Sequence, residues 1–417
     1  MSNPLSPLLG QAAPSRKPTR PWIRHQHQVT ITPEAFSTLD AADPVPQMEI
    51  IMDLFTAGSH IADLKPQVRK GRSSPHPTHT WTGKLAQVGD SDVTLVVKGQ
   101  VLVGSIRYGH TLYEIKPSGG SGYELTEVDA NALPSDHYPV SVSQQELDAA
   151  DQLAGLLGIA QVPGVDADTG TVIDVMVVYT TAAKNANGGQ SGIEALIALG
   201  ISLANQAFIN SQIGTQFRLV HAAEVSYAES GNYNTDLTRL RSTNDGFMDE
   251  VHAWRNTFKA DLVALIEDNL GGACGVAYVM GNVSASFANY AFSVTEDSCI
   301  AGYTLAHELG HNMGSAHDRA EGGTGAYPYS FGHKEAGKYR TIMAYGCTQA
   351  CTRINHFSNP NIQYQGWPTG VDHNLDPARS ADNARAFTNA LSTLANFRNS
   401  GDTQPPPPPG NLRIIDP

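Results

Sequence analysis

One stretch decides the fold of this chain: His307-Glu308-Leu309-Gly310-His311-Asn312-Met313-Gly314-Ser315-Ala316-His317-Asp318. It has the pattern H-E-x-x-H-x-x-G-x-x-H, followed by aspartate. Histidines four residues apart lie on one face of a helix, so His307 and His311 can reach the same metal ion. Gly314 suits the end of this helix, because glycine accepts the left-handed conformation found there. The chain can then turn back and bring in His317 as a third nitrogen ligand.

Three protein ligands leave one metal position for water, which is the arrangement of a catalytic zinc site rather than a structural one. Glu308 directly follows the first histidine, and a carboxylate at this place can take a proton from a water on the metal. The alternative is a helix with stray histidines. The extended pattern makes that alternative weak, since it fixes a glycine and a third histidine as well.

The extended histidine pattern resembles the metzincin clan of zinc endopeptidases. Downstream, Thr341-Ile342-Met343-Ala344-Tyr345 resembles the Met-turn of that clan. The sequence His-Glu-Leu-Gly-His-Asn, together with Asp318 after the third histidine, resembles sequences of the adamalysin/reprolysin branch. Tyr345, two residues after the methionine, is closer to the astacin and serralysin pattern. The chain is identified as a reprolysin-like, bacterial-type secreted metalloprotease with an N-terminal propeptide.

The resemblance implies a role for each residue near the histidines. One Zn2+ is held by the three histidines, and Glu308 is the general base. Tyr345 donates a hydrogen bond to the oxyanion, or alternatively only packs under the site. Met343 forms an apolar floor beneath the imidazoles, and Asp318 holds either a loop or a ligand histidine. Calcium is possible, but no motif indicates it.

Composition bounds the class of protein. The chain has 417 residues, of which 41% are hydrophobic and 16% charged, so we expect two folded domains. The net charge of −13 argues against a nucleic-acid partner, which would need basic patches. No apolar run approaches the roughly 18 residues of a membrane helix, so no membrane span is expected. We expect a monomer.

Four cysteines flank the histidine motif: Cys274, Cys299, Cys347 and Cys351. An even number suggests two disulfides and an oxidising compartment, and hence a secreted, extracellular protein. The preferred pairing is Cys274 with Cys299 and Cys347 with Cys351, although the other pairings stay open. A structural zinc on these cysteines is a weaker alternative, because no C-x-x-C pair occurs. No signal peptide is evident in the sequence.

The expected fold class is α+β, or mixed α/β. A twisted mixed sheet with an active-site helix follows a smaller, mainly antiparallel β domain. The predicted segments are a disordered leader (1–25), a propeptide domain (26–160), a linker (161–171), the metzincin domain (172–400) and a proline-rich tail (401–417).

Local patterns predict the elements of both domains. In the first, strands are expected at 93–97, 101–106 and 111–115, and short helices or mixed structure over 26–65. In the second, the predicted strands are 172–179, 216–227 and 261–266, and the predicted helices are 144–157, 191–213, 247–258 and 387–397.

A further short strand is predicted at Gly275–Val279. The resemblance implies that this strand borders the cleft and that protein or peptide substrates bind along it as an added strand, held by main-chain hydrogen bonds. The alternative is a plain interior strand.

The first domain carries no hydrolase signature, and we expect it to act as the chain's own inhibitory partner. A cysteine switch is excluded, since no cysteine precedes Cys274. Asp129, Asp136 and His137 are the candidates for blocking the zinc. The alternative is that they are ordinary solvated loop residues.

Three hypotheses follow for the function. The leading one is a zinc-dependent endopeptidase made as a zymogen. The second is a catalytically silent metzincin fold used for binding, and the third is a zinc hydrolase acting on a non-peptide amide or ester.

Overall fold

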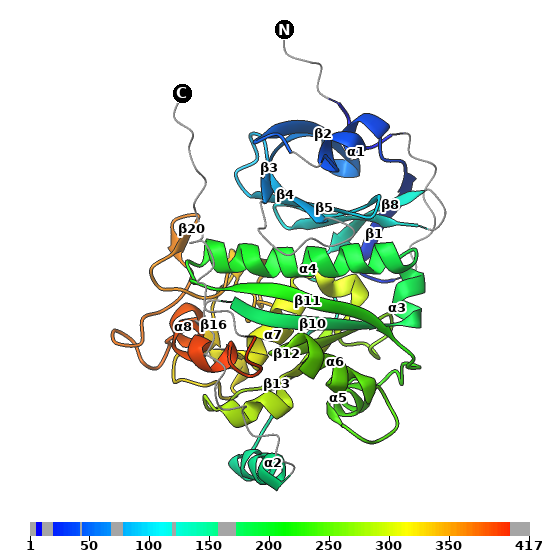
Figure 1. Ribbon diagram of the computed structural model, residues 1–417. Helices are drawn as coiled ribbons and strands as arrows, with labels where there is room; N and C mark the ends of the chain where they lie inside the picture. Colours follow the sequence, from blue (N-terminus) through cyan, green and yellow to red (C-terminus); the bar gives the residue numbers. More distant parts are fainter. Residues whose placement is uncertain are drawn as a thin grey trace.

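The computed structural model describes residues 6–10, 20–41, 44–67, 78–118, 122–156 and 172–400. Two units stack on opposite sides of one long helix, α4 (Gln190–Asn210) (Figure 1). The linker predicted at 161–171 and the tail predicted at 401–417 lie outside the described residues.

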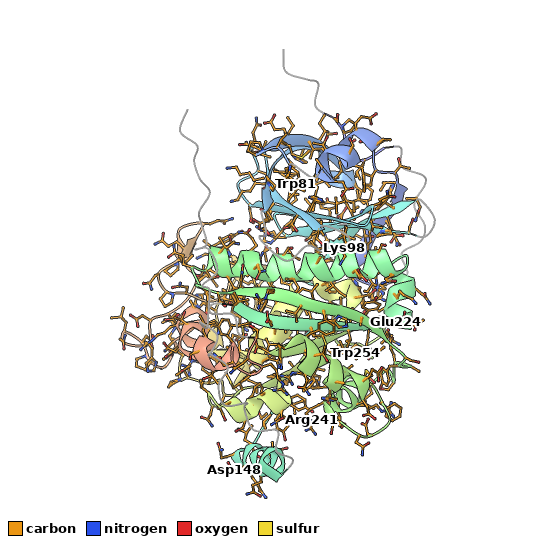
Figure 2. All side chains as sticks on the ribbon, in the orientation of Figure 1. Trp81, Lys98, Asp148, Glu224, Arg241 and Trp254 are labelled. Atoms are coloured by element: carbon orange, nitrogen blue, oxygen red, sulfur yellow. A yellow bond between two sulfur atoms is a disulfide. The ribbon has the colours of Figure 1, made fainter. Side chains whose placement is uncertain are left out.

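The first unit is an eight-stranded antiparallel sheet with the order β1-β8-β7-β6-β5-β4-β3-β2. Its strands are β1 (Ile23–Val29), β2 (Met48–Leu54), β3 (Gly58–Gln67), β4 (Thr78–Leu85), β5 (Ser91–Lys98), β6 (Val101–Tyr108), β7 (Thr111–Pro117) and β8 (Tyr123–Asp129). The sheet curls around a core that contains Trp81 (Figure 2), whose indole N–H donates to the Leu39 carbonyl at the end of α1 (Pro33–Leu39). The predicted antiparallel character is confirmed.

The expectation of short helices or mixed structure over 26–65 is confirmed, since α1 lies there among strands. Residues 48–54 form strand β2, because Ile50, Met52 and Leu54 alternate with more exposed neighbours, which is the period of a strand. The predicted disordered leader, in contrast, is partly folded. Leu8 is fully buried, and its N–H donates to the Ile51 carbonyl at 2.7 Å.

The second unit contains a six-stranded mixed sheet with the order β11-β10-β12-β14-β13-β9. Its strands are β9 (Val140–Ser141), β10 (Val172–Thr180), β11 (Gln216–Val225), β12 (Leu262–Glu267), β13 (Gly275–Val279) and β14 (Phe292–Glu296). Strands β11, β10, β12 and β14 run parallel, and β13 runs antiparallel to β14. The mixed sheet is as predicted. The edge strand β9 comes from the chain that leaves the first unit.

Helices and short strands complete the second unit. The α-helices besides α4 are α2 (Gln144–Leu156), α3 (Thr181–Ala186), α5 (Tyr233–Arg241), α6 (Glu250–Phe258), α7 (Thr304–Asn312) and α8 (Asn383–Leu394). The short strands are β15 (Ala316–Asp318), β16 (Phe331–Gly332), β17 (Lys334–Glu335), β18 (Tyr339–Arg340), β19 (Thr352–Arg353), β20 (Gln363–Tyr364) and β21 (Trp367–Pro368). The described 3-10 helices of this unit are η2 (Ala285–Tyr290), η3 (Asp297–Gly302) and η4 (Arg319–Glu321), whereas η1 (Phe55–Ala57) joins β2 to β3 in the first unit.

Helix α4 is apolar on most of its surface because it lies between the two sheets (Figure 1). Among the described helices it is the one whose length and hydropathy would suit a membrane span, contrary to the expectation from the sequence. Within the fold, however, 83% of its apolar window is buried, so α4 is a core helix. Val96 and Val103 of the first sheet belong to the same hydrophobic core as α4.

Ion pairs also join the two units. Lys98, which is labelled in Figure 2, lies at the end of β5. It pairs with Glu194 of α4 at 3.0 Å. Arg20 pairs with Asp268 at 3.0 Å and with Glu296.

The four cysteines form the two preferred disulfides, Cys274–Cys299 and Cys347–Cys351. No cysteine is left free, which removes the alternative of a structural zinc. The first bridge ties the start of β13 to η3, directly ahead of α7.

Candidate active site

Helix α7 carries the first two histidines and ends where the sequence predicts. Gly314 has φ = +97°, the left-handed region in which a side chain is strained. A Cβ at Gly314 would also come within 2.7 Å of Ala326. The turn sends the chain into β15, which returns His317 to the face of α7 that carries His307 and His311.

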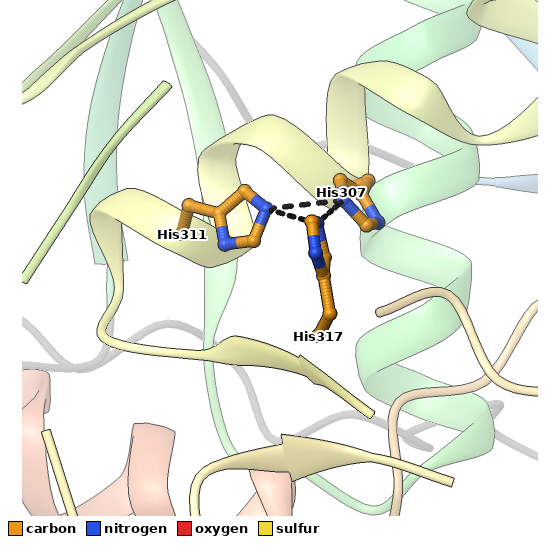
Figure 3. A group of neighbouring side chains, drawn as sticks. All are labelled: His307, His311 and His317. Atoms are coloured by element: carbon orange, nitrogen blue, oxygen red, sulfur yellow. Dashed lines mark hydrogen bonds between the residues drawn. The ribbon is translucent and has the colours of Figure 1, made fainter. Parts of the chain in front are cut away.

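The three histidines converge on one point (Figure 3). Their Nε2 atoms lie 3.1 Å apart in all three pairs. Nδ1 of His307 contacts the Ile342 carbonyl at 2.8 Å, and Nδ1 of His311 contacts the Ser315 carbonyl at 2.6 Å. The Ser315 carbonyl can only accept, so it places the proton of His311 on Nδ1 and leaves the Nε2 lone pair of His311 facing the other two imidazoles. Within the described chain, no other group of His, Cys, Asp or Glu has metal-binding geometry.

The electrostatics favour neutral histidines, which are the form that binds metal. Burial lowers the pKa of His311 to about 4. Burial also holds the pKa of His317 far below its usual value, with a further contribution from the other two histidines. Three converging neutral donors repel one another unless a cation lies between them, so the donor set fits a divalent metal.

Glu308 supplies the second observation that fits a metal. Its side chain is fully buried, and neither carboxylate oxygen has a hydrogen-bond partner among the described residues. Burial accordingly raises the pKa of Glu308 well above its ordinary value. Gly275 of β13 makes room for it, since a Cβ there would lie 2.5 Å from Oε1 of Glu308. A buried acid without partners beside converging nitrogens is suited to a cation and the water that it polarises.

The Met-turn lies directly under the helix. Met343 is fully buried, and a Cβ added to Gly310 would come within 2.6 Å of its sulfur. Asp318 holds this turn rather than a ligand histidine. One of its oxygens accepts from the Tyr345 N–H at 3.0 Å, and the other pairs with Lys334 at 2.9 Å.

Tyr345 lies at the mouth of the site. Its ring centroid is 3.9 Å from that of His317. Its hydroxyl donates a hydrogen bond to the backbone carbonyl of Asp136, which belongs to the chain leaving the first unit.

This chain segment, residues 135–141, lies along the edge of the second sheet. The Cys274 N–H donates to the Ser135 carbonyl at 3.2 Å, and the His137 N–H donates to the Gly275 carbonyl at 2.7 Å. Further on, β9 pairs in parallel with β13. The edge that the resemblance assigns to substrate is therefore paired with the chain itself. Tyr138 lies beside one of the histidines, with its ring 5.6 Å from that of His317.

The three candidates for blocking the zinc lie in different places. Asp129 pairs with Arg24 at 2.6 Å, and the ring of His137 lies 4.0 Å from that of Tyr233. Asp136 is buried close to the site, but its Oδ2 is 3.6 Å from Nδ1 of His307, the nitrogen that faces away from the metal position. The structure places none of the three in the converging histidine group.

Sequence reasoning missed the residue that holds Asp136. The Nη2 of Arg353 donates to Oδ2 of Asp136 at 2.6 Å. This pair holds the pKa of Asp136 well below its usual value, against the opposing effect of burial. No local pattern singles out Arg353, because its partner lies 217 residues earlier in the chain.

Comparison with known proteins finds metallopeptidases. A family model described as Metallo-peptidase family M12B Reprolysin-like matches residues 169–372. A peptidyl-Asp metalloendopeptidase of Stenotrophomonas maltophilia is 35% identical over 86% of this chain and 84% of its own length. A peptidyl-Asp metalloendopeptidase of Xanthomonas campestris pv. campestris is 36% identical over 73% of this chain and 69% of its own length. Among solved structures, metalloproteinase-II from Bacteroides fragilis aligns at 14% identity and a TM-score of 0.40, covering 65% of this chain and 81% of that one.

Proposed function

Because the chain belongs to the reprolysin-like metallopeptidases of family M12B and is a zinc-dependent metalloendopeptidase, we propose that it is made as a zymogen that acts on peptidyl-aspartate bonds. The observation that carries the zymogen proposal is the pairing of residues 135–141 with β13, across the mouth of the histidine site. The aspartate preference is proposed from the names of the relatives. Membership of a peptidase family disfavours both the silent binding protein and the non-peptide hydrolase.

The metal we propose is a single zinc ion held by His307, His311 and His317. Imidazole nitrogen suits zinc, and three protein ligands are typical of its catalytic sites. Bound zinc would supply a Lewis acid that polarises the scissile carbonyl and lowers the pKa of a water. Removing one histidine would leave too few ligands to hold it.

The chain's own residues move the protons. Glu308 accepts the proton of the attacking water and passes it to the leaving amine. No protein group engages its oxygens among the described residues, so the carboxylate is free for both transfers. Tyr345 donates its hydroxyl hydrogen bond to the developing oxyanion once the Asp136 carbonyl has left.

Substrate would take the place of the inhibitory segment. Strand β13 offers its main-chain groups to an extended polypeptide, which is a sequence-tolerant mode of recognition. In the intact chain β9 and the residues before it use these groups. We therefore assign residues 26–160 to an inhibitory propeptide and the predicted linker, 161–171, to the processing site. The two disulfides support an extracellular location.

Hydrolysis of unfolded casein tests this proposal. The full-length protein with zinc is compared with Glu308→Ala and with a sample treated with a chelator. We expect only the untreated wild type to be active. Wild type and Glu308→Ala should both bind zinc. Equal hydrolysis by Glu308→Ala would remove the proposed base. Activity that survives complete removal of metal would remove the proposed chemistry.

A further inference from the structure

Arg353 of β19 is a buried cation held rigidly beside the metal site. Its side chain is 8% exposed. Nε donates to the Ile342 carbonyl at 3.0 Å, and Nη1 donates to the Gly302 carbonyl at 3.3 Å. Nη2 lies 2.6 Å from Nδ1 of His307, so the guanidinium directly adjoins the first metal-binding histidine.

The carboxylate that neutralises Arg353 does not come from the second unit's own fold. Among the described residues, Asp136 is the one acid in ion-pair contact with Arg353, and it lies on the inhibitory segment. Its other oxygen accepts from the Thr304 hydroxyl at 3.0 Å. Its backbone carbonyl accepts from the Tyr345 hydroxyl. The side chain of Asp136 thus binds Arg353, while its backbone carbonyl accepts the hydrogen bond of the Tyr345 hydroxyl, the donor that we assign to substrate.

A second, half-buried arginine lies nearby. Arg340 donates through Nη1 to the Ala344 carbonyl at 2.7 Å, while its Nε has no partner in the part of the chain that the structure describes. Both arginines, Thr304 and Tyr345 line a cavity of about 340 Å3, which His110 of the first unit also lines. When the inhibitory segment leaves β13, this cavity opens and the buried charge of Arg353 loses its counter-ion, Asp136. An uncompensated buried charge is costly, so the open cavity favours an anionic side chain.

We propose that Arg353, supported by Arg340, is the specificity-determining residue that binds the aspartate side chain of the substrate next to the scissile bond. In the intact chain, Asp136 occupies the position of that substrate aspartate. This inference rests on the proposed function, because it concerns the same cleft. Asp136 reaches Arg353 while its own carbonyl stays on Tyr345. A glutamate would have to fit one more methylene between these two anchors, so aspartate is preferred.

The first test compares two internally quenched peptides that differ only in an aspartate or an asparagine beside the cut bond. Full-length protein, allowed to process itself with zinc, is assayed for kcat/KM on each. We expect wild type to prefer aspartate by about 100-fold or more, since a charge-assisted pair is lost with asparagine. In Arg353→Gln the ratio should fall to about one. Arg24→Gln is the matched control, because Arg24 forms a 2.6 Å pair with Asp129 outside the cleft and should leave the ratio unchanged.

The outcomes separate the two proposals. If wild type cuts neither peptide nor casein, the proposed function fails. If wild type cuts both peptides equally, or Arg353→Gln keeps the aspartate preference, the inference about Arg353 is overturned while the endopeptidase stands. Should Arg353→Gln not fold, Arg353→Lys replaces it. Lysine keeps the charge without the fork of donors, and we expect a ratio between those of wild type and one.

The second test addresses Asp136 in the intact chain. Asp136→Asn keeps the shape but weakens the anchor of the inhibitory segment, so we expect self-processing to be about 10-fold faster than in wild type. Asp129→Asn is its control and should process at the wild-type rate. Equal rates for Asp136→Asn and wild type would show that Asp136 does not hold the segment in place.

Discussion

The hydroxyl of Tyr345 donates a hydrogen bond to the backbone carbonyl of Asp136, a residue 209 positions earlier in the chain. Tyr345 is the last residue of the Met-turn in the second unit, and Asp136 lies on the segment that connects the first unit to the second. The group that we assign to the oxyanion is therefore already occupied by a peptide carbonyl. This contact places the inhibitory segment where substrate must go.

Replacing Tyr345 by phenylalanine removes this donor and keeps the ring against His317. We expect kcat on a peptide substrate to fall by about 100-fold, because the lost hydrogen bond is strongest when charge develops on the oxygen. Bound zinc, measured by mass spectrometry of the metal, should not change. An unchanged kcat would mean that Tyr345 only packs under the site, which is the alternative left open by the sequence.

Gly275→Ala tests the close approach of β13 to Glu308. The new Cβ would lie 2.5 Å from Oε1 and 2.6 Å from Cγ of Glu308, so the carboxylate must move. We expect turnover to fall by more than about 10-fold, because small displacements of a catalytic group are costly. Gly281→Ala is the matched control, since nothing lies within 4 Å of its added Cβ. Similar rates for the two variants would contradict the assigned position of Glu308.

A buried acid at the contact between the units predicts a dependence of stability on pH. Burial raises the pKa of Asp297 to about 6, against the opposing charges of Lys116 and Arg20 and the hydrogen bond from Asn187, while Asp268 adds to the rise. The folded protein thus binds a proton that the unfolded chain releases near pH 3.8. Protonated Asp297 therefore contributes up to about 3 kcal/mol to the free energy of unfolding. This stabilisation is fully present below about pH 4 and is lost as the pH rises through about 6.

Asp297→Asn should remove that loss. We expect the melting temperature of the variant, relative to wild type, to increase between pH 4 and pH 7. If the melting temperatures of variant and wild type differed by the same amount at every pH in this range, Asp297 would have an ordinary pKa in the folded protein.

The two units should stay together after the chain is cut between them. Val96 and Val103 pack into the core that contains α4, and Arg20 pairs with Asp268 across the contact. After processing we expect both fragments to elute together in gel filtration. Arg20→Gln should promote their separation, and added salt should do the same in wild type, since exposed ion pairs are screened. Free fragments at low salt would show that the contact is weaker than its packing indicates.

The sequence was sufficient to predict that the three histidines converge, because their spacing is local. Four residues along a helix bring His307 to His311, and the left-handed turn at Gly314 returns His317. The strand Gly275–Val279 was predicted with the same bounds that the structure shows. Its neighbour β14 was missed, since its five buried residues give no alternating pattern.

Other features depended on distant parts of the chain. Arg353 could not be identified as a site residue from the sequence, because its partner Asp136 reaches it only in the folded chain. Leu8 was assigned to a disordered leader because residues 1–25 are rich in Pro, Ser, Arg and Lys, whereas its own side chain completes the first core. The strand β2 was missed although Ile50 and Met52 alternate in burial, because a run of apolar residues also suits short helices.

An intact-mass time course of the full-length protein with zinc, beside Glu308→Ala, tests whether the chain processes itself through Glu308. We expect wild type to be cut within the predicted linker, 161–171, into two fragments whose masses sum to the intact mass plus one water, while Glu308→Ala stays intact. Self-processing by this site would be contradicted if both proteins stayed whole and wild type also failed to cut casein, or if Glu308→Ala were processed as fast as wild type.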